Sequence, residues 1–237
     1  MKRDVIIALD FKDGETALNF LDKFQEEKPF VKVGMELFFA EGPSIVTEIK
    51  RRGHKIFLDL KLHDSPNTVK GGMRSLTNLG ADILNVHAAG TIEMMKAALE
   101  GTQRPDGTAP MLIAVTQLTS TSEERMQKDL LINATINDTI LHYAKNAKEA
   151  GLAGVVCSPL EAGMVKAALG KDFVTVTRYQ ICRQRKGRPG SYHNTGKSKR
   201  NRHRLYCCRP SYYTGRRPCC RIPPLYERIC RRGRRII

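Results

Sequence analysis

The sequence predicts an α/β protein, a (β/α)8 TIM barrel whose eighth strand–helix unit is lost. Two observations support this prediction. Seven short apolar runs recur through the first 177 of the 237 residues, and amphipathic stretches with helical spacing lie between them. Strands that alternate with helices form parallel sheets, and near-continuous apolar strands are buried on both faces. Seven such units favour a barrel, and an open doubly wound sheet is the alternative.

The predicted strands are rich in β-branched residues, and they span residues 5–9, 31–35, 55–60, 83–88, 111–118, 154–158 and 173–177. The predicted helices show apolar residues three and four apart, and they span residues 14–27, 43–53, 66–80, 91–101, 138–151 and 159–170. Several of these helices end in glycine, which is a common helix stop. No glycine-rich fingerprint follows the first strand, which disfavours a dinucleotide-binding fold.

Charge divides the chain into two regions. Residues 1–177 hold 21 Lys and Arg against 23 Asp and Glu, whereas residues 178–237 hold 19 against one. Six of the seven cysteines also lie in the second region, which has few Leu, Val or Ile to bury. We therefore expect a barrel domain over residues 1–177 and a basic, disordered tail over residues 178–237. The net charge of +16 describes neither region.

Nothing in the sequence predicts export or membrane insertion. The apolar run near the start meets Asp10 too soon for a signal peptide. No run approaches the roughly 18 apolar residues of a membrane helix. One cysteine in residues 1–177 fits a reducing compartment. We expect a cytoplasmic protein with no membrane partner.

Charged residues gather where predicted strands end, which is where barrel enzymes carry out catalysis. Asp59 and Lys61 are two apart, so strand alternation points both into the barrel mouth, and Lys32 can join them from the neighbouring strand. A buried array of this kind is costly unless its charges are paired. A fixed carboxylate repels an anionic substrate until the substrate loses its charge, and a nearby lysine can protonate the carbanion that remains. This is the logic of a decarboxylase that needs no cofactor.

Simpler interpretations exist for the same residues. An Asp-x-Lys pair at a strand end also occurs as a structural salt bridge. Asp10 also fits a helix N-cap, and His87 fits a packing histidine. His63 lies on the opposite alternation from Asp59 and Lys61, so alternation alone leaves it out of the array.

The stretch DLKLHDSPNT, residues 59–68, closely resembles the signature of the orotidine 5′-phosphate decarboxylase family. The segments IIALDF, FVKVGMELF, EGPSIV, VHAAG, LIAVTQLTSTS and GVVCS also resemble that family, in the same order. The resemblance covers residues 4–177. Ser65 departs from it, because the family usually has an aliphatic residue there, and so does Thr91.

The resemblance implies the conversion of orotidine 5′-monophosphate to UMP, the last step of de novo pyrimidine synthesis, without metal or cofactor. It implies a homodimer with shared active sites. By position, Lys61 would donate the proton to C6, Asp59 would crowd the departing carboxylate, and Lys32 would complete the charge array. Asp64 would reach into the partner subunit's site.

The resemblance also implies a set of substrate contacts. Asp10 would bind the ribose, with Lys32 close by. The substrate would further be lined by Asp59, Leu60, Lys61, Leu62, His63, Asp64, Ser65, Pro66, Asn67, Thr68 and Thr119. Related barrels share the Asp-x-Lys-x-x-Asp pattern, so a metal-dependent sugar-phosphate decarboxylase or hexulose-phosphate synthase is the alternative.

After Thr177 the family continues with a Pro-Gly-Ile-Arg loop and an eighth strand ending in Val-Gly-Arg, which grip the substrate phosphate. Neither segment is present here. One explanation is a basic extension that binds RNA or a membrane. Tyrosines interleaved with the basic residues could stack on bases. The other explanation is a reading-frame shift near codon 177.

The genetic code favours the frame shift. With an offset of one base, residues 178–182 can read Gly-Ile-Arg-Phe-Ala, and residues 206–214 can read Ile-Val-Val-Gly-Arg-Pro-Ile-Thr plus one further residue. A single offset thus recovers both missing motifs in order. We therefore expect no nucleic-acid partner. We also expect unpaired edges on the first and seventh strands, poor folding and almost no activity.

Overall fold

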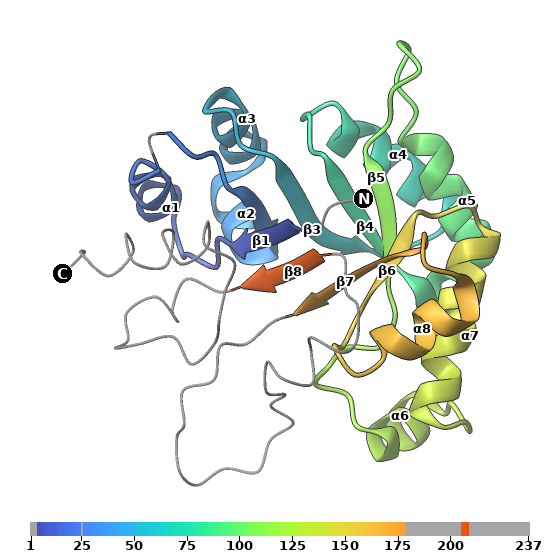
Figure 1. The fold of residues 1–237 in the computed structure, drawn as a ribbon. Coiled ribbons are helices and arrows are strands. Elements are labelled where there is room, and N and C mark those ends of the chain that lie inside the picture. Colours follow the sequence, from blue (N-terminus) through green and yellow to red (C-terminus); the bar gives the residue numbers. More distant parts are fainter. Residues whose placement is uncertain (1–3, 25, 179–204, 209–237) are drawn as a thin grey trace, which may run out of the picture.

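The seven apolar runs form strands of one closed parallel barrel in a computed structural model, which describes residues 4–24, 26–178 and 205–208 (Figure 1). Each strand pairs in parallel with its neighbours in chain order. The strands are β1 (Asp4–Ala8), β2 (Phe30–Gly34), β3 (Ile56–Leu62), β4 (Ile83–His87), β5 (Met111–Val115), β6 (Gly154–Cys157), β7 (Val174–Arg178) and β8 (Leu205–Cys208). The predicted barrel is therefore confirmed, and the open sheet is excluded.

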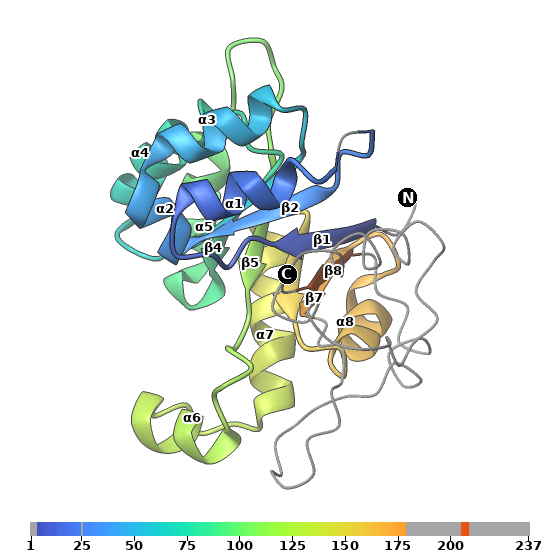
Figure 2. The same ribbon diagram turned by 90° about the vertical axis from the view of Figure 1, so that its left-hand side faces the viewer.

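The prediction that the eighth strand is lost is wrong. β8 lies between β7 and β1, as Figures 1 and 2 show. Tyr206 is paired with Val5 on one side and with Thr177 on the other. Both edges that the sequence left open are therefore paired, because a strand ladder is made by backbone groups that every non-proline residue carries. The phosphate loop and the eighth helix lie outside the described residues.

The described helices lie outside the barrel (Figure 1). They are α1 (Gly14–Leu21), α2 (Met35–Glu41), α3 (Pro43–Arg51), α4 (Pro66–Thr77), α5 (Thr91–Gly101), α6 (Glu123–Leu130), α7 (Ile136–Glu149) and α8 (Ala162–Leu169), with a 3-10 turn η1 (Ala88–Gly90). On one side of the barrel lie α1, α2 and α3, and on the other lie α4, α5, α7 and α8 (Figure 1). The sequence pattern does not predict α2 and α6. Each has one buried hydrophobic residue, Leu37 in α2 and Met126 in α6, so neither shows the apolar periodicity of a packed helix.

The helix that follows β1 is capped by Asp13, whose carboxylate accepts a hydrogen bond from the backbone N–H of Thr16 at 2.7 Å. Asp10 therefore does not cap this helix, and the N-cap interpretation of Asp10 is wrong. Asp10 lies in the loop between β1 and α1, at the carboxyl end of the barrel.

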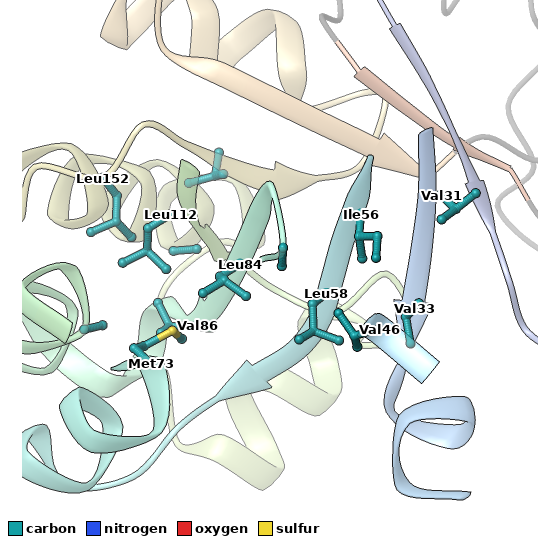
Figure 3. Packing of buried hydrophobic residues seen from close by; sticks show 14 of the residues in the cluster. Val31, Val33, Val46, Ile56, Leu58, Met73, Leu84, Val86, Leu112 and Leu152 are labelled. Atoms are coloured by element: carbon teal, nitrogen blue, oxygen red, sulfur yellow. The ribbon is translucent and has the colours of Figure 1, made fainter. Parts of the chain in front are cut away.

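Side chains of successive strand residues alternate between two apolar layers. Ile6, Phe57, Ile83 and Ile113 belong to a small cluster within the barrel. Their strand neighbours belong to the larger cluster that packs against the helices, and Figure 3 shows several of its members: Val31, Val33, Val46, Ile56, Leu58, Met73, Leu84, Val86, Leu112 and Leu152. The middle of the barrel is thus filled with side chains. A ligand can therefore bind only at an end of the barrel, and the cavity described below lies at the carboxyl end.

The predicted tail is described only at Arg178 and at residues 205–208. Its predicted disorder falls on residues outside the described part of the chain. Within the described part, no helix is both long and apolar enough to cross a membrane.

Candidate active site

A cavity of about 290 Å³ opens at the carboxyl ends of the strands. β1, β2, β3, β5, β6 and β7 all contribute residues to its wall, either from the strand or from the loop after it. Four of the predicted charged residues line this cavity: Asp10, Lys32, Asp59 and Lys61. The structure therefore brings these four side chains together at one end of the barrel, as the sequence predicts.

The four charges form a connected array centred on Asp59. Its carboxylate contacts Lys61 Nζ through Oδ1 at 2.7 Å and Lys32 Nζ through Oδ2 at 3.4 Å. Lys32 also reaches Asp10 Oδ1 at 3.2 Å. The side chains of Lys32 and Asp59 are only 12% and 13% exposed, so these contacts replace most of their hydration. Buried charges of opposite sign are tolerated when they are paired in this way.

The pKa of Asp59 reflects two opposing effects. Burial favours the neutral acid, but the positive charges of Lys32 and Lys61, with hydrogen bonds from Lys61 and Asn85, hold the pKa of Asp59 below its ordinary value. Asp59 is therefore a carboxylate at neutral pH. A permanent negative charge is thus held in the wall of the cavity.

The backbone of Lys61 is unusual for a strand residue. Its φ angle is 56°, in the left-handed region, and the pairing of β3 with β4 shifts register between Leu58 and Leu62. The backbone N–H of Lys61 donates to Asn85 Oδ1 at 2.8 Å instead of to a strand carbonyl. The irregularity lies at the residue that we expect to act on substrate, as strained backbone often does.

Thr119 follows β5 and also lines the cavity, next to Gln117 and Leu118. The remaining predicted substrate contacts, all within the described part of the chain, do not line it. Leu60 and Leu62 pack against the core under the helices. The others lie at the end of β3 and the start of α4: His63, Asp64, Ser65, Pro66, Asn67 and Thr68. Their roles remain predictions.

Asp64 is exposed, and its Oδ1 accepts a hydrogen bond from the backbone N–H of Ser65 at 2.6 Å. It therefore does not join the array within one chain.

His63 stacks on His87, with ring centroids 5.6 Å apart and an angle of 15° between the rings. Burial is the main cause that lowers the pKa of His87, and electrostatic interactions with His63 and Lys61 lower it further. His87 Nδ1 accepts from the Ala89 backbone, which suits its expected packing role.

Four polar residues of the site were not predicted from the sequence: Glu36, Asn85, Gln117 and Arg178. Asn85 contacts both Asp59 and Lys61, and an amide within the apolar run ILNVHA was a signal that could have revealed it. Glu36, Gln117 and Arg178 line the cavity. Arg178 lies just beyond residues 4–177, to which the motif resemblance is limited, so no motif points to it.

No group of three or more His, Cys, Asp and Glu side chains that could hold a metal ion occurs within the described residues. Cys157 lines the cavity as a buried free thiol, and burial raises its pKa, so it is protonated at neutral pH. The charged groups that can act on a ligand in the cavity are therefore carboxylates and amines from the described strands and loops and from α2, together with the guanidinium of Arg178.

Comparisons with known proteins agree with this geometry. Residues 3–195 match the family model described as the orotidine 5′-phosphate decarboxylase / HUMPS family. The orotidine 5′-phosphate decarboxylase of Bacillus cytotoxicus is 56% identical over 180 residues, which is 75% of this chain and 76% of that protein. The Bacillus mycoides enzyme of the same name is 55% identical over the same shares.

Solved structures give the same result for the fold. An uncharacterized conserved protein from Geobacillus kaustophilus matches with a TM-score of 0.81 at 40% identity, over 97% of this chain and 99% of that one. Orotidine 5′-phosphate decarboxylase from Lactobacillus acidophilus matches with a TM-score of 0.79 at 34% identity, over 98% and 99%. With the family model matched over most of its length, this chain belongs to the orotidine 5′-phosphate decarboxylase / HUMPS family.

Proposed function

We propose that this chain is built to decarboxylate orotidine 5′-monophosphate to UMP in pyrimidine biosynthesis. The Lys32–Asp59–Lys61 array in the wall of the cavity is the observation that carries the proposal. In the reaction, the bond between C6 and the carboxylate breaks, CO2 leaves, and the electron pair stays on C6. A proton from Lys61 Nζ then completes UMP. The reaction needs no external oxidant or reductant, so a side chain that donates a proton is sufficient to complete it.

Asp59 would supply the driving repulsion. Its carboxylate is held in place by two lysines and an amide, so it cannot turn away from a second carboxylate in the cavity. The repulsion is present with bound substrate and disappears as CO2 forms, so it favours the transition state over the ground state. Lys61 would stabilise the charge that develops on C6 and then donate its proton.

Asp10 and Lys32 would bind the ribose hydroxyl groups. Their ion pair of 3.2 Å lies at the edge of the array, and both residues line the cavity. Thr119 would contact the substrate from the loop after β5. Leu60, Leu62, His63, Ser65, Pro66, Asn67 and Thr68 would then shape and support the segment that carries Lys61 and Asp64.

A homodimer would complete the site. Asp64 is exposed at the end of β3, close in sequence to Lys61, and so is free to face a second subunit. We propose that it enters the partner's cavity. Size-exclusion chromatography with light scattering tests this directly, because Asp64→Arg should dissociate the dimer if the carboxylate lies against the partner's site.

The basic region after residue 177 is proposed to derive from a shifted reading frame, with residues 1–177 as the domain that keeps the family chemistry. The position of β8 supports this, because Leu205–Cys208 overlaps the residues that read Ile-Val-Val in the offset frame. The phosphate grip would be missing, so we expect weak substrate binding and low turnover. A cytoplasmic location is part of the same proposal, since the family is metabolic.

The test uses two proteins: this chain and a restored chain, in which the codons after Thr177 are read with the one-base offset. Conversion of orotidine 5′-monophosphate to UMP is followed by chromatography, with Lys61→Ala of each protein as the blank. Turnover by the restored chain that persists in a chelator supports the proposal. A chelator-sensitive reaction, or turnover of a sugar phosphate instead, would assign the chain to the metal-dependent relatives. The curated relatives reported above carry the decarboxylase name, which disfavours that alternative.

A further inference from the structure

Asn85 is a polar residue in the middle of the apolar strand β4. It is 1% exposed, and its neighbours Leu84 and Val86 are 0% exposed. Burying an amide is unfavourable unless its donor and its acceptor both find partners. Both ends of this amide are used, and both partners belong to the charge array.

The acceptor end of the amide holds the backbone of Lys61. Its Oδ1 accepts the Lys61 N–H at 2.8 Å at the point where β3 leaves regular register with β4. Lys61 has a φ of 56°, which residues with a β-carbon seldom adopt. The side chain of Asn85 thus takes the place of a strand carbonyl and satisfies the donor that the irregularity would otherwise leave buried without a partner.

The donor end of the amide orients the carboxylate of Asp59. Its Nδ2 donates to Asp59 Oδ1 at 2.6 Å, and the same oxygen contacts Lys61 Nζ at 2.7 Å. The other oxygen of Asp59 faces Lys32 at 3.4 Å, and Lys32 in turn faces Asp10. With one oxygen held by Asn85 and Lys61 and the other by Lys32, the carboxylate has a single orientation.

We infer that Asn85 is a positioning residue that fixes Asp59 and Lys61 relative to each other through one planar amide. The inference rests on the proposed function, because it assigns Asn85 a purpose in the decarboxylation attributed to those two residues. Its chemistry is specific to an amide. Alanine lacks both hydrogen bonds. Aspartate keeps the acceptor for Lys61 but sets an oxygen against Asp59 where the donor had been.

The kinetic test compares Asn85→Ala and Asn85→Asp with the unaltered full-length chain. Single turnovers with enzyme in excess separate the limiting rate from the half-saturating concentration. We expect the limiting rate to fall about 100-fold in both variants at neutral pH, since small misplacements of reacting groups have effects of this size. Substrate binding should change little. Asn85→Asp should regain rate as the pH is lowered, because a shared proton restores a donor to Asp59, and Asn85→Ala should not.

Thr116→Val is the control, because it removes a hydrogen bond made by another buried polar side chain of the barrel. Thr116 directly follows β5, and its Oγ1 donates to the carbonyl of Val156 in β6 at 3.0 Å. Thr116 is not among the residues that line the cavity. Thr116→Val and Asn85→Ala should both lower the thermal midpoint of unfolding. Thr116→Val should leave the limiting rate unchanged.

A second readout needs no activity. With carboxyl-labelled aspartate, NMR follows the titration of Asp59, which Asn85→Ala should shift upward and Thr116→Val should not. If the turnover of the unaltered chain is too low to measure, the rates are compared in the restored chain, whose inactivity would overturn the proposed function, and the titration in the unaltered chain still decides the role of Asn85. An Asp59 titration and a limiting rate that match the Thr116→Val control would overturn the inference. If the alanine variant does not fold, the near-isosteric aspartate variant is judged by the same two readouts.

Discussion

Residues 1–177 and residues 178–237 contribute to this molecule in different ways. The first region supplies seven strands, the helices of the described part of the chain and every predicted residue of the charge array. The described part of the second region supplies Arg178 and the four residues of β8, which close the barrel through backbone pairing with β1 and β7. Residues 205–208 close the fold although the two motifs expected after Thr177 do not stand in the sequence, because strand pairing uses backbone groups. We propose that the side chains needed to grip a phosphate are missing, because neither the Pro-Gly-Ile-Arg loop nor the Val-Gly-Arg strand end stands in the sequence.

The largest effect should come from the centre of the first region. Lys61→Ala removes the proposed proton donor and one of the two cations that hold Asp59. We expect the turnover of the restored chain to fall by about 10²- to 10⁴-fold, the usual contribution of a positioned proton donor. Lys96→Ala, at an exposed position of α5, is the control and should leave turnover unchanged. Equal turnover in the two variants would remove Lys61 from the mechanism.

The next largest effect should come from a substitution in the hydrophobic core of residues 1–177. Leu84 is 0% exposed, and Leu84→Ala leaves a cavity under the helices. We expect the free energy of unfolding in urea to fall by about 2–5 kcal/mol. Leu131→Ala, at a residue that is 79% exposed, should change it little. A small effect at Leu84 would mean that the barrel is not packed as described.

The second region should show a smaller effect that depends on the backbone alone. Tyr206→Pro removes one N–H from β8 and with it one ladder hydrogen bond, which we expect to lower the free energy of unfolding by about 1–3 kcal/mol. Tyr206→Val keeps the N–H and is the control. If both variants unfold at the same urea concentration as the unaltered chain, β8 does not close the barrel.

The smallest effect should appear in the pH dependence of stability. Burial lowers the pKa of His87, so the folded protein takes up this proton less readily than the unfolded chain does. The stability that neutral His87 provides is complete above about pH 6.5, the ordinary value, and is lost as the pH falls toward the lower folded value. Urea unfolding at pH 7.5 and pH 5.5 should therefore show a smaller acid loss in His87→Gln. An unchanged loss would exclude this titration.

The sequence predicts the seven strands and the meeting of Asp10, Lys32, Asp59 and Lys61, because apolar runs and strand ends are local signals. It does not predict α2 or α6, since each buries a single hydrophobic side chain. It also fails at β8, because composition reports side chains whereas the pairing of β8 uses backbone groups.

Asn85 is the site residue that the sequence pattern predicts least. Strand alternation explains why Asp59 and Lys61 share a face, but alternation does not predict the left-handed turn of Lys61 or the register shift beside it. These features depend on a contact between neighbouring strands, 24 residues apart in sequence. A polar residue in an otherwise apolar strand is the only local trace of that contact.

The most direct test of this account compares the decarboxylation of orotidine 5′-monophosphate by this chain and by the restored chain. Each charge-assisted hydrogen bond to a phosphate is worth about 1.5–3 kcal/mol, or about 10- to 100-fold. We therefore expect kcat/KM to be at least about 100-fold higher for the restored chain, while both chains keep the same folded barrel. Equal values of kcat/KM would contradict the account, because they would show that residues 178–237 already supply what the reaction needs.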